Sequence, residues 1–276
     1  MCIRDSGGRE SAAFVVDPRS GRVLGQRGFD GELSGAVVAG RRMLFMLAPH
    51  AAIGQARLAI VDPDGSIRTV VLPGIAAGLT PARDEQDTAR QASPGLAVDP
   101  DGTRAVVVSP ETLLEIDLET LAILRLKHLA DRATTRARKR IEGWGRHAVW
   151  LRGGAVAVVG RSYSTEGDRV ISTTTGLALI DIATGTSRML DATATGTTRA
   201  GDTLLAHGGT ALRGYGLGGT LRFELLAGQD SGYVQTSGRY TYIGSENSTR
   251  FVVVDSVAGR MVGTARTPSP TIVLGP

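Results

Sequence analysis

The feature that most constrains the fold is a repeated segment in which an apolar run ends in Asp and Gly follows after two or three residues. The clear copies are 14–17 with Gly21, 58–62 with Gly65, 177–181 with Gly185, and 251–255 with Gly259, and a degenerate copy, 113–117, has Leu121 in place of glycine. Asp can bond the backbone of its own turn and Gly can adopt a positive φ. Each copy therefore predicts a β-hairpin.

The spacing of these segments predicts their assembly. The Asp that ends each copy is at 17, 62, 117, 181 and 255, and a weak copy without Asp ends at Gly216. These positions are 45, 55, 64, 35 and 39 residues apart, a mean of about 48. A period of this length made of strands is typical of propeller blades. The apolar runs do not alternate with polar residues, which is expected where neighbouring sheets pack on both faces. We predict an all-β propeller of four-stranded blades, with strands a to d in chain order.

Five complete blades can be assigned, at 34–73, 93–130, 146–191, 196–228 and 230–267. Residues 11–31 supply only strands c and d of another blade, and 270–274 predict one further strand. A seven-bladed native ring that lacks one blade and half of another fits this count best, and a six-bladed ring is the alternative.

The first six residues, Met1–Ser6, back-translate to a sequence close to the end that transposase-based library kits leave on sequencing reads. We interpret 1–6 as translated adapter and 7–276 as a single, N-terminally truncated propeller domain; an ordinary N-terminus is the alternative. Cys2, the only cysteine, is then not native, so we predict no disulfide and no Cys-bound metal.

The composition limits the classes of partner. The net charge is +4, but only two of the 31 basic residues are Lys, and such an excess of Arg resembles GC-rich codon usage more than a nucleic-acid surface. The 12 aromatic residues leave few platforms for base stacking, so we expect no nucleic-acid partner. We also expect no transmembrane segment, because no apolar run approaches the roughly 18 residues that a span needs.

The segment Gly95–Leu121 resembles a YVTN-type β-propeller repeat. It has an apolar strand, then Asp99-Pro100-Asp101-Gly102, a second apolar strand, and a strand that ends at Asp117 before a Thr-containing turn. Residues 176–276 resemble the closing blades of uncharacterised exported actinobacterial propellers, a quinoprotein-like and WD40-like group. The resemblance implies the fold and an exported bacterial protein, located in the periplasm, at the cell surface or outside the cell, but no catalytic or binding residues.

Blade topology sorts the connections onto two faces. The a–b and c–d turns share one face, and the predicted ones are tight: 62–65, 99–102, 153–154, 181–185 and 237–238. The b–c and d–a connections share the other face and contain every long segment: 48–56, 74–91, 131–146 and 161–175. Binding residues usually lie in long loops on a rigid scaffold. We therefore predict that the loop-rich face binds a ligand, with neutral insertion as the alternative.

The densest basic cluster lies in the segment 131–146, and 129–141 has the composition of a short helix. It predicts a patch for an anionic partner; a solvated loop with Trp144 against the sheet is the alternative. The segment 161–175 is rich in donors, which suits a polar ligand. The predicted ligand-binding residues are Arg136, Arg138, Lys139, Arg140, Trp144, Arg161, Tyr163, Asp168, Arg169 and His50.

Catalytic and metal-binding patterns are not found in the sequence. Asp84, Glu85 and Asp87 could pair with the basic cluster, but they lack the spacing of a calcium loop. The four histidines have no ligand spacing and no Gly-x-Ser-x-Gly occurs. Residues 214–219 match Gly-x-Gly-x-x-Gly but continue into a strand, so they predict a c–d hairpin rather than a phosphate loop. We predict no catalytic residues, no metal and no cofactor.

Two functions fit these observations. The first is a non-enzymatic binding or scaffold propeller, monomeric at full length, that uses its loop-rich face for an unknown protein or an anionic polymer. The alternative is a lactonase-like or quinoprotein-like propeller enzyme with its active site at the mouth of the central channel. The enzyme would need carboxylates or histidines that converge from several blades.

Overall fold

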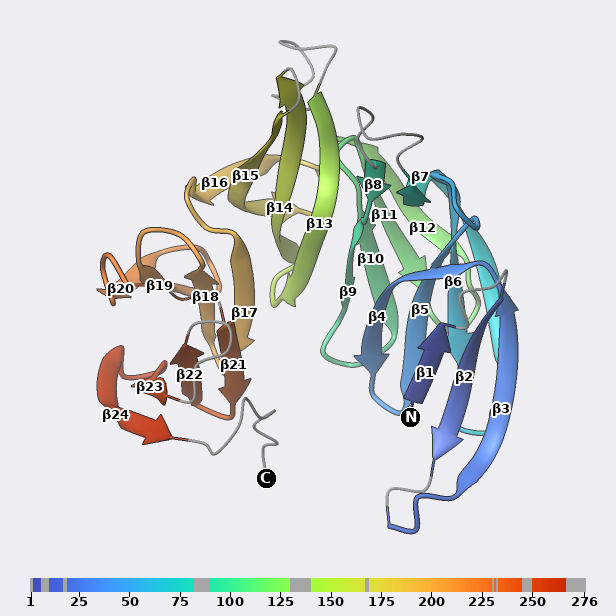
Figure 1. Cartoon of the computed structure of the whole chain (residues 1–276), viewed down its shortest axis with the longest axis horizontal. Coiled ribbons are helices and arrows are strands. Elements are labelled where there is room, and N and C mark those ends of the chain that lie inside the picture. Colours follow the sequence, from blue (N-terminus) through green and yellow to red (C-terminus); the bar gives the residue numbers. More distant parts are fainter. Residues whose placement is uncertain are drawn as a thin grey trace. The chain divides into compact units, whose positions relative to one another are not determined.

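The computed structural model describes residues 2–5, 10–16, 19–81, 90–129, 140–166, 169–229, 231, 233–244 and 250–266 (Figure 1). The described chain is 68% strand and contains no helix. Its sheets are antiparallel and arranged as propeller blades, which confirms the predicted all-β propeller fold. The short helix predicted over 129–141 lies mostly outside the described residues, and its last two residues belong to a strand.

The chain divides into two compact units, which we describe separately. The first contains Met1–Arg146, Ser162–Ser172 and Ile182–Gly185. It holds three complete sheets, in the orders β1-β2-β3, β4-β5-β6-β7-β8 and β12-β11-β10-β9. Their strands are β1 (Cys2–Asp5), β2 (Glu10–Val16), β3 (Val23–Asp30), β4 (Glu32–Ala39), β5 (Arg42–Ala48), β6 (Gly54–Val61), β7 (Ile67–Thr80), β8 (Arg90–Ala92), β9 (Gly95–Val98), β10 (Arg104–Val108), β11 (Thr112–Asp117) and β12 (Ile123–His128).

The second unit contains His147–Arg161, Thr173–Asp181 and Thr186–Pro276. It holds the sheets β17-β18-β19-β20 and β21-β22-β23-β24, while the sheet β13-β14-β15-β16 draws residues from both units. The strands are β13 (Arg140–Leu151), β14 (Ala155–Glu166), β15 (Arg169–Asp181), β16 (Ser187–Asp191), β17 (Gly196–Ala200), β18 (Thr203–His207), β19 (Leu212–Gly216), β20 (Leu221–Leu225), β21 (Tyr233–Ser237), β22 (Tyr240–Gly244), β23 (Arg250–Asp255) and β24 (Arg260–Arg266).

The five sheets from β4 onward coincide with the five predicted blades. The first departs from the prediction, because β7 continues past residue 73 and its end pairs with a fifth strand, β8. The register between β6 and β7 jumps from Arg57↔Val71 to Gln55↔Ala76, so β7 bulges where the prediction ended it. At the N-terminus, β2 and β3 are the two predicted strands and β1 pairs with β2. The interpretation of Met1–Ser6 as adapter stays a prediction.

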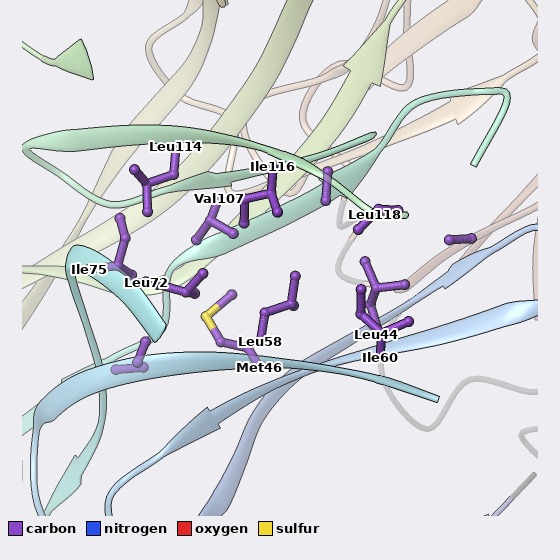
Figure 2. Packing of buried hydrophobic residues seen from close by; sticks show 14 of the residues in the cluster. Leu44, Met46, Leu58, Ile60, Leu72, Ile75, Val107, Leu114, Ile116 and Leu118 are labelled. Carbon is purple, nitrogen blue, oxygen red and sulfur yellow. The ribbon is translucent and has the colours of Figure 1, made fainter. Parts of the chain in front are cut away.

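Both faces of the inner strands are buried, which explains the unalternating apolar runs. In the first unit, Leu44 and Met46 of β5 pack against Val107, Leu114 and other residues of the next blade (Figure 2). The residues between them point to the opposite face, where Phe45 packs at a ring-centroid distance of 5.7 Å from Phe29. A strand between two sheets therefore needs apolar residues at every position rather than at every second one.

The second unit repeats this arrangement in β18. Leu204 and Ala206 pack in a cluster with residues of β13 to β15, while Leu205 faces a cluster with Ile243 and Val254 of the last blade. Burial of each such side chain contributes about 1.5–3 kcal/mol. Within each unit, apolar layers thus hold neighbouring blades together.

The repeated Asp and Gly have the predicted roles in the c–d turns. Gly65 and Gly259 adopt φ values of 82° and 64°, and Leu121 of the degenerate copy adopts 61° at the same place. Asp117 accepts hydrogen bonds from the backbone N–H groups of Glu119 and Thr120 at 3.0 and 2.7 Å. The hairpin predicted over 214–219 is also present, with Gly219 donating to the Gly216 carbonyl.

Candidate binding surface

Because the strands of each sheet are antiparallel, the connections between them alternate between the two ends of the blade. We call the end with the a–b and c–d turns the tight-turn end, and the end with the b–c and d–a connections the loop-rich end. The turns after Asp62, Asp99 and Asp181 all join adjacent antiparallel strands, as predicted.

Ion pairs and hydrogen bonds within the protein hold the tight-turn end. Asp62 pairs with Arg42 at 2.8 Å and with Arg68 at 2.9 Å. Both guanidinium groups also reach the next blade, where Arg42 meets the Glu119 carboxylate and Arg68 donates to the Leu118 and Glu119 carbonyls. In the second unit Arg188 likewise donates to Gly218, in the c–d turn of the following blade. These arginines therefore hold neighbouring blades together.

The loop-rich end of the first unit contains His50, a predicted ligand-binding residue. Its Nδ1 lies 2.6 Å from a Glu32 carboxylate oxygen, and the same oxygen accepts the N–H of Ala51 at 3.1 Å. Ala51 adopts a positive φ of 49°, and the Thr80 hydroxyl oxygen accepts a hydrogen bond from the N–H of Ile53. His50 thus helps to fix the turn between β5 and β6 onto the start of β4.

The loop-rich end of the second unit is organised by a buried carboxylate, Asp191. It accepts hydrogen bonds from the Thr193 N–H and hydroxyl, from the Ala194 N–H, and from Arg213 at 2.8 Å. Burial raises the pKa of Asp191, but these bonds lower it more, so the net shift is downward. Arg213 is shared with Glu224, which is far more exposed.

Sequence reasoning missed a second polar cluster in this unit, around His207. Burial lowers the pKa of His207 to about 4, a hydrogen bond to the Ser231 backbone opposes that shift, and the nearby His147 adds to it. Burial of the ring also lowers the pKa of His147, although that residue keeps more than a third of its surface exposed. The signal in the sequence is weak, because the two histidines are 60 residues apart.

The His207 ring requires a glycine beneath it. Gly196 pairs with His207 across β17 and β18, and a Cβ atom on Gly196 would overlap the imidazole. We expect Gly196→Ala to lower the free energy of unfolding by about 1–3 kcal/mol, the usual result of overpacking. Gly263→Ala, in β24, is the control, because a Cβ there meets nothing within 4 Å. Equal denaturation midpoints for the two variants would contradict the packing.

The remaining predicted residues cluster around β13, β14 and β15. Arg140 and Trp144 lie in β13, Tyr163 in β14 and Arg169 in β15, and Arg161 is an exposed residue of β14. Since these strands are neighbours in one antiparallel sheet, the start of β13, the end of β14 and the start of β15 share its loop-rich end. Arg136, Arg138, Lys139 and Asp168 lie outside the described residues.

The segment 161–175 is not the predicted long loop. β14 runs to Glu166 and β15 starts at Arg169, so nearly all of it is strand. Its Ser, Thr, Val and Ile residues explain the difference, because β-branched side chains favour strands even where no core imposes a polar–apolar alternation. We call the part of this sheet that lies within the first unit the outer sheet: 140–146, 162–166 and 169–172.

Two further features bear on the chemistry of the surface. Within the ranges that the structure describes, no group of three or more His, Cys, Asp or Glu side chains could hold a metal ion. No helix in those ranges is long and apolar enough to span a membrane.

Comparison with known proteins supports the class of fold. No protein-family model and no curated protein sequence matches the chain. Among solved structures, it is similar to the β-propeller domain of the Trilobed protease from Pyrococcus furiosus, with 12% identity, a TM-score of 0.54, and coverage of 96% of this chain and 80% of that one. The Neurospora crassa Pan2 WD40 domain matches with 9% identity, a TM-score of 0.53 and coverage of 90% and 69%.

A third neighbour is the WD40 domain of SCAP from fission yeast, with 10% identity, a TM-score of 0.50 and 87% of this chain covered. The chain spans 57% of that structure and 63% of the dihydro-heme d1 dehydrogenase NirN. At these identities the likeness concerns the fold alone. The chain is therefore a β-propeller, with WD40 domains among its structural neighbours.

Proposed function

We propose that this chain is a non-enzymatic binding propeller that contacts an anionic partner through the outer sheet. One observation carries the proposal: β13, β14 and β15 are 12, 12 and 13 residues long, whereas the corresponding strands β17 to β19 have five residues each. About seven extra residues add roughly 20 Å to each strand. Three strands lengthened together at one end form a surface that blade packing does not require.

The charge of the surrounding sequence favours an anionic partner. The segments 129–146 and 161–175 together contain eight basic and four acidic residues, an excess of +4 that equals the net charge of the whole chain. The rest of the chain therefore sums to zero. A local excess of one sign attracts partners of the opposite sign and speeds their association.

The tight-turn end is less suited to this role. Its Arg42, Arg68 and Arg239 are held in ion pairs with Asp62 and Asp255. A guanidinium group that already has a carboxylate partner contributes little net attraction to a second anion. The ion pairs of these three arginines reduce the attraction of the tight-turn end for an anion, and export of the protein stays a prediction.

Heparin, a flexible polyanion, tests the proposal. We expect its affinity to fall on the order of 100-fold between 50 and 200 mM salt, the change that about four neutralised charges produce. Substituting Ser for Arg136, Arg138 and Arg140 together should weaken binding at least about tenfold. The melting temperature should change little, since exposed charges contribute little stability.

A matched variant separates location from total charge. Replacing Arg41, Arg152 and Arg260 with Ser removes the same charge from three exposed positions at the tight-turn end. We expect this triple variant to retain most of its heparin affinity, as measured by titration calorimetry at 50 mM salt. Equal losses in the two triple variants would show that net charge, and not the outer sheet, determines binding.

A further inference from the structure

The open edge of β15 distinguishes the outer sheet from the other sheets. β16 pairs with β15 only from Leu177 to Ile180. β15 has no described neighbours other than β14 and β16. Over the described strands, nothing therefore pairs with Arg169–Ser172 on the side away from β14. Among the described strands this stretch is therefore an unpaired sheet edge, and Ile171 and Ser172 within it are exposed.

Beyond Arg169 at its start, this edge lacks the charged residues that normally protect a sheet edge. Natural edges are blocked by Lys, other charges, Pro or bulges, because unpaired backbone groups pair readily with another chain. From Val170 to Thr175 there is no charged residue and no Pro, and five of the six residues are Val, Ile or Thr. The outermost strands of the blades do carry charges, at Arg125 and Lys127 in β12, Arg188 in β16, and Arg222 and Glu224 in β20.

The strand is fixed just beyond the open edge. Thr174 donates to the Ala194 carbonyl and lies within 3.4 Å of the Gly160 carbonyl. Gly176 has a φ of 75° and lies against the backbone of Asp191 and Ala192, where a Cβ atom would not fit. A strand that is already held in its bound conformation loses less conformational entropy when another strand adds to it.

We propose that the Arg169–Ser172 edge binds an extended, acidic peptide segment of a partner protein as an added β-strand. The inference rests on the proposed function and specifies its partner. Backbone hydrogen bonds supply affinity in this mode of recognition. The +4 excess of the flanking segments selects an acidic sequence and disfavours a second copy of this chain, which carries the same excess.

The probe is the peptide acetyl-Glu-Val-Glu-Val-Glu-Val-Glu-amide, compared with the same peptide N-methylated at all seven residues. Both have the same charge, but the methylated peptide has lost the backbone donors along both of its edges. We expect the parent peptide to bind and the methylated peptide to bind at least about tenfold more weakly. Hydrogen exchange should slow only with the parent peptide, at those amides of 169–172 that point away from β14.

Proline substitutions locate the edge without a change in the probe. Successive N–H groups of a strand point in opposite directions, so Val170→Pro and Ile171→Pro remove donors from opposite sides of β15. One variant should lose peptide affinity and keep its melting temperature, whereas the other should lose stability because its donor serves β14. Unchanged peptide affinity in both variants would overturn the proposal.

The outcomes distinguish this inference from the proposed function. Equal, salt-sensitive binding of both peptides would overturn strand addition and leave an anion-binding surface. Heparin binding without peptide binding would do the same. If neither heparin nor peptide binds, both proposals are wrong. Dimerisation at the same edge, seen by sedimentation of the unliganded protein and lost in one proline variant, would assign the edge to a second copy and overturn the peptide proposal.

Discussion

Replacement of Asp191 with Ala is expected to lower the free energy of unfolding by about 1–3 kcal/mol, the usual cost of leaving buried hydrogen-bond donors without an acceptor. The carboxylate is 3% exposed and is bonded to Thr193, Ala194 and Arg213. Its removal leaves the N–H groups of Thr193 and Ala194 without their acceptor, while Arg213 keeps its ion pair with Glu224. Urea denaturation measures the loss.

Glu224 provides the matched control, because it pairs with the same Arg213 at 2.7 Å but is 44% exposed. We expect Glu224→Ala to lower stability by no more than about 1 kcal/mol. The lowered pKa of Asp191 also fixes the sign of its pH effect: its contribution is complete above pH 4 and disappears as the pH falls through the folded-state pKa. Similar losses from the two Ala variants would contradict the buried network.

Acid is expected to destabilise the second unit through His207 well before its carboxylates titrate. The folded-state pKa is about 4, against 6.5 for an ordinary histidine. Between these values the unfolded chain binds a proton that the folded chain does not. Stability is therefore full above pH 6.5 and falls as the pH drops to 4, by up to about 3 kcal/mol in total.

Denaturation midpoints measured between pH 4 and 7 test this effect. His207→Gln should remove most of the slope, because the variant has no imidazole to protonate at that position. His128→Gln, at an exposed position of β12, should keep the slope of the parent chain. A parent chain whose stability does not change over this range would show that the His207 ring is solvated.

The blade pattern could be predicted because its cause is local. An Asp that bonds its own turn and a Gly with positive φ mark each c–d hairpin, and the apolar run before them records burial on two faces. Even Leu121, which breaks the pattern, adopts the φ of the glycine that it replaces. Leu121 packs against the apolar cluster of the first unit, a contact that a glycine could not make.

The outer sheet and the arginine pairs could not be predicted in the same way. Polar strands such as Ser162–Glu166 carry no apolar period, so they resemble a loop in sequence. The abundant arginine suggested codon usage, yet Arg42 joins Asp62 and Glu119, which are 20 and 77 residues away. His50 was predicted to bind a ligand, but in the structure it pairs with Glu32, and this contact can be recognised only when the strand pairing is known. These roles depend on contacts between distant parts of the chain.

Arginine footprinting tests the location of the binding surface most directly. The protein would be labelled with phenylglyoxal with and without heparin, and the modified arginines would be identified by mass spectrometry. We expect heparin to protect Arg140, Arg146 and Arg169 of the outer sheet, while Arg41, Arg152 and Arg260 react at the same rate in both samples. Protection of the second group, with the first group unaffected, would contradict the assignment of the outer sheet as the binding surface.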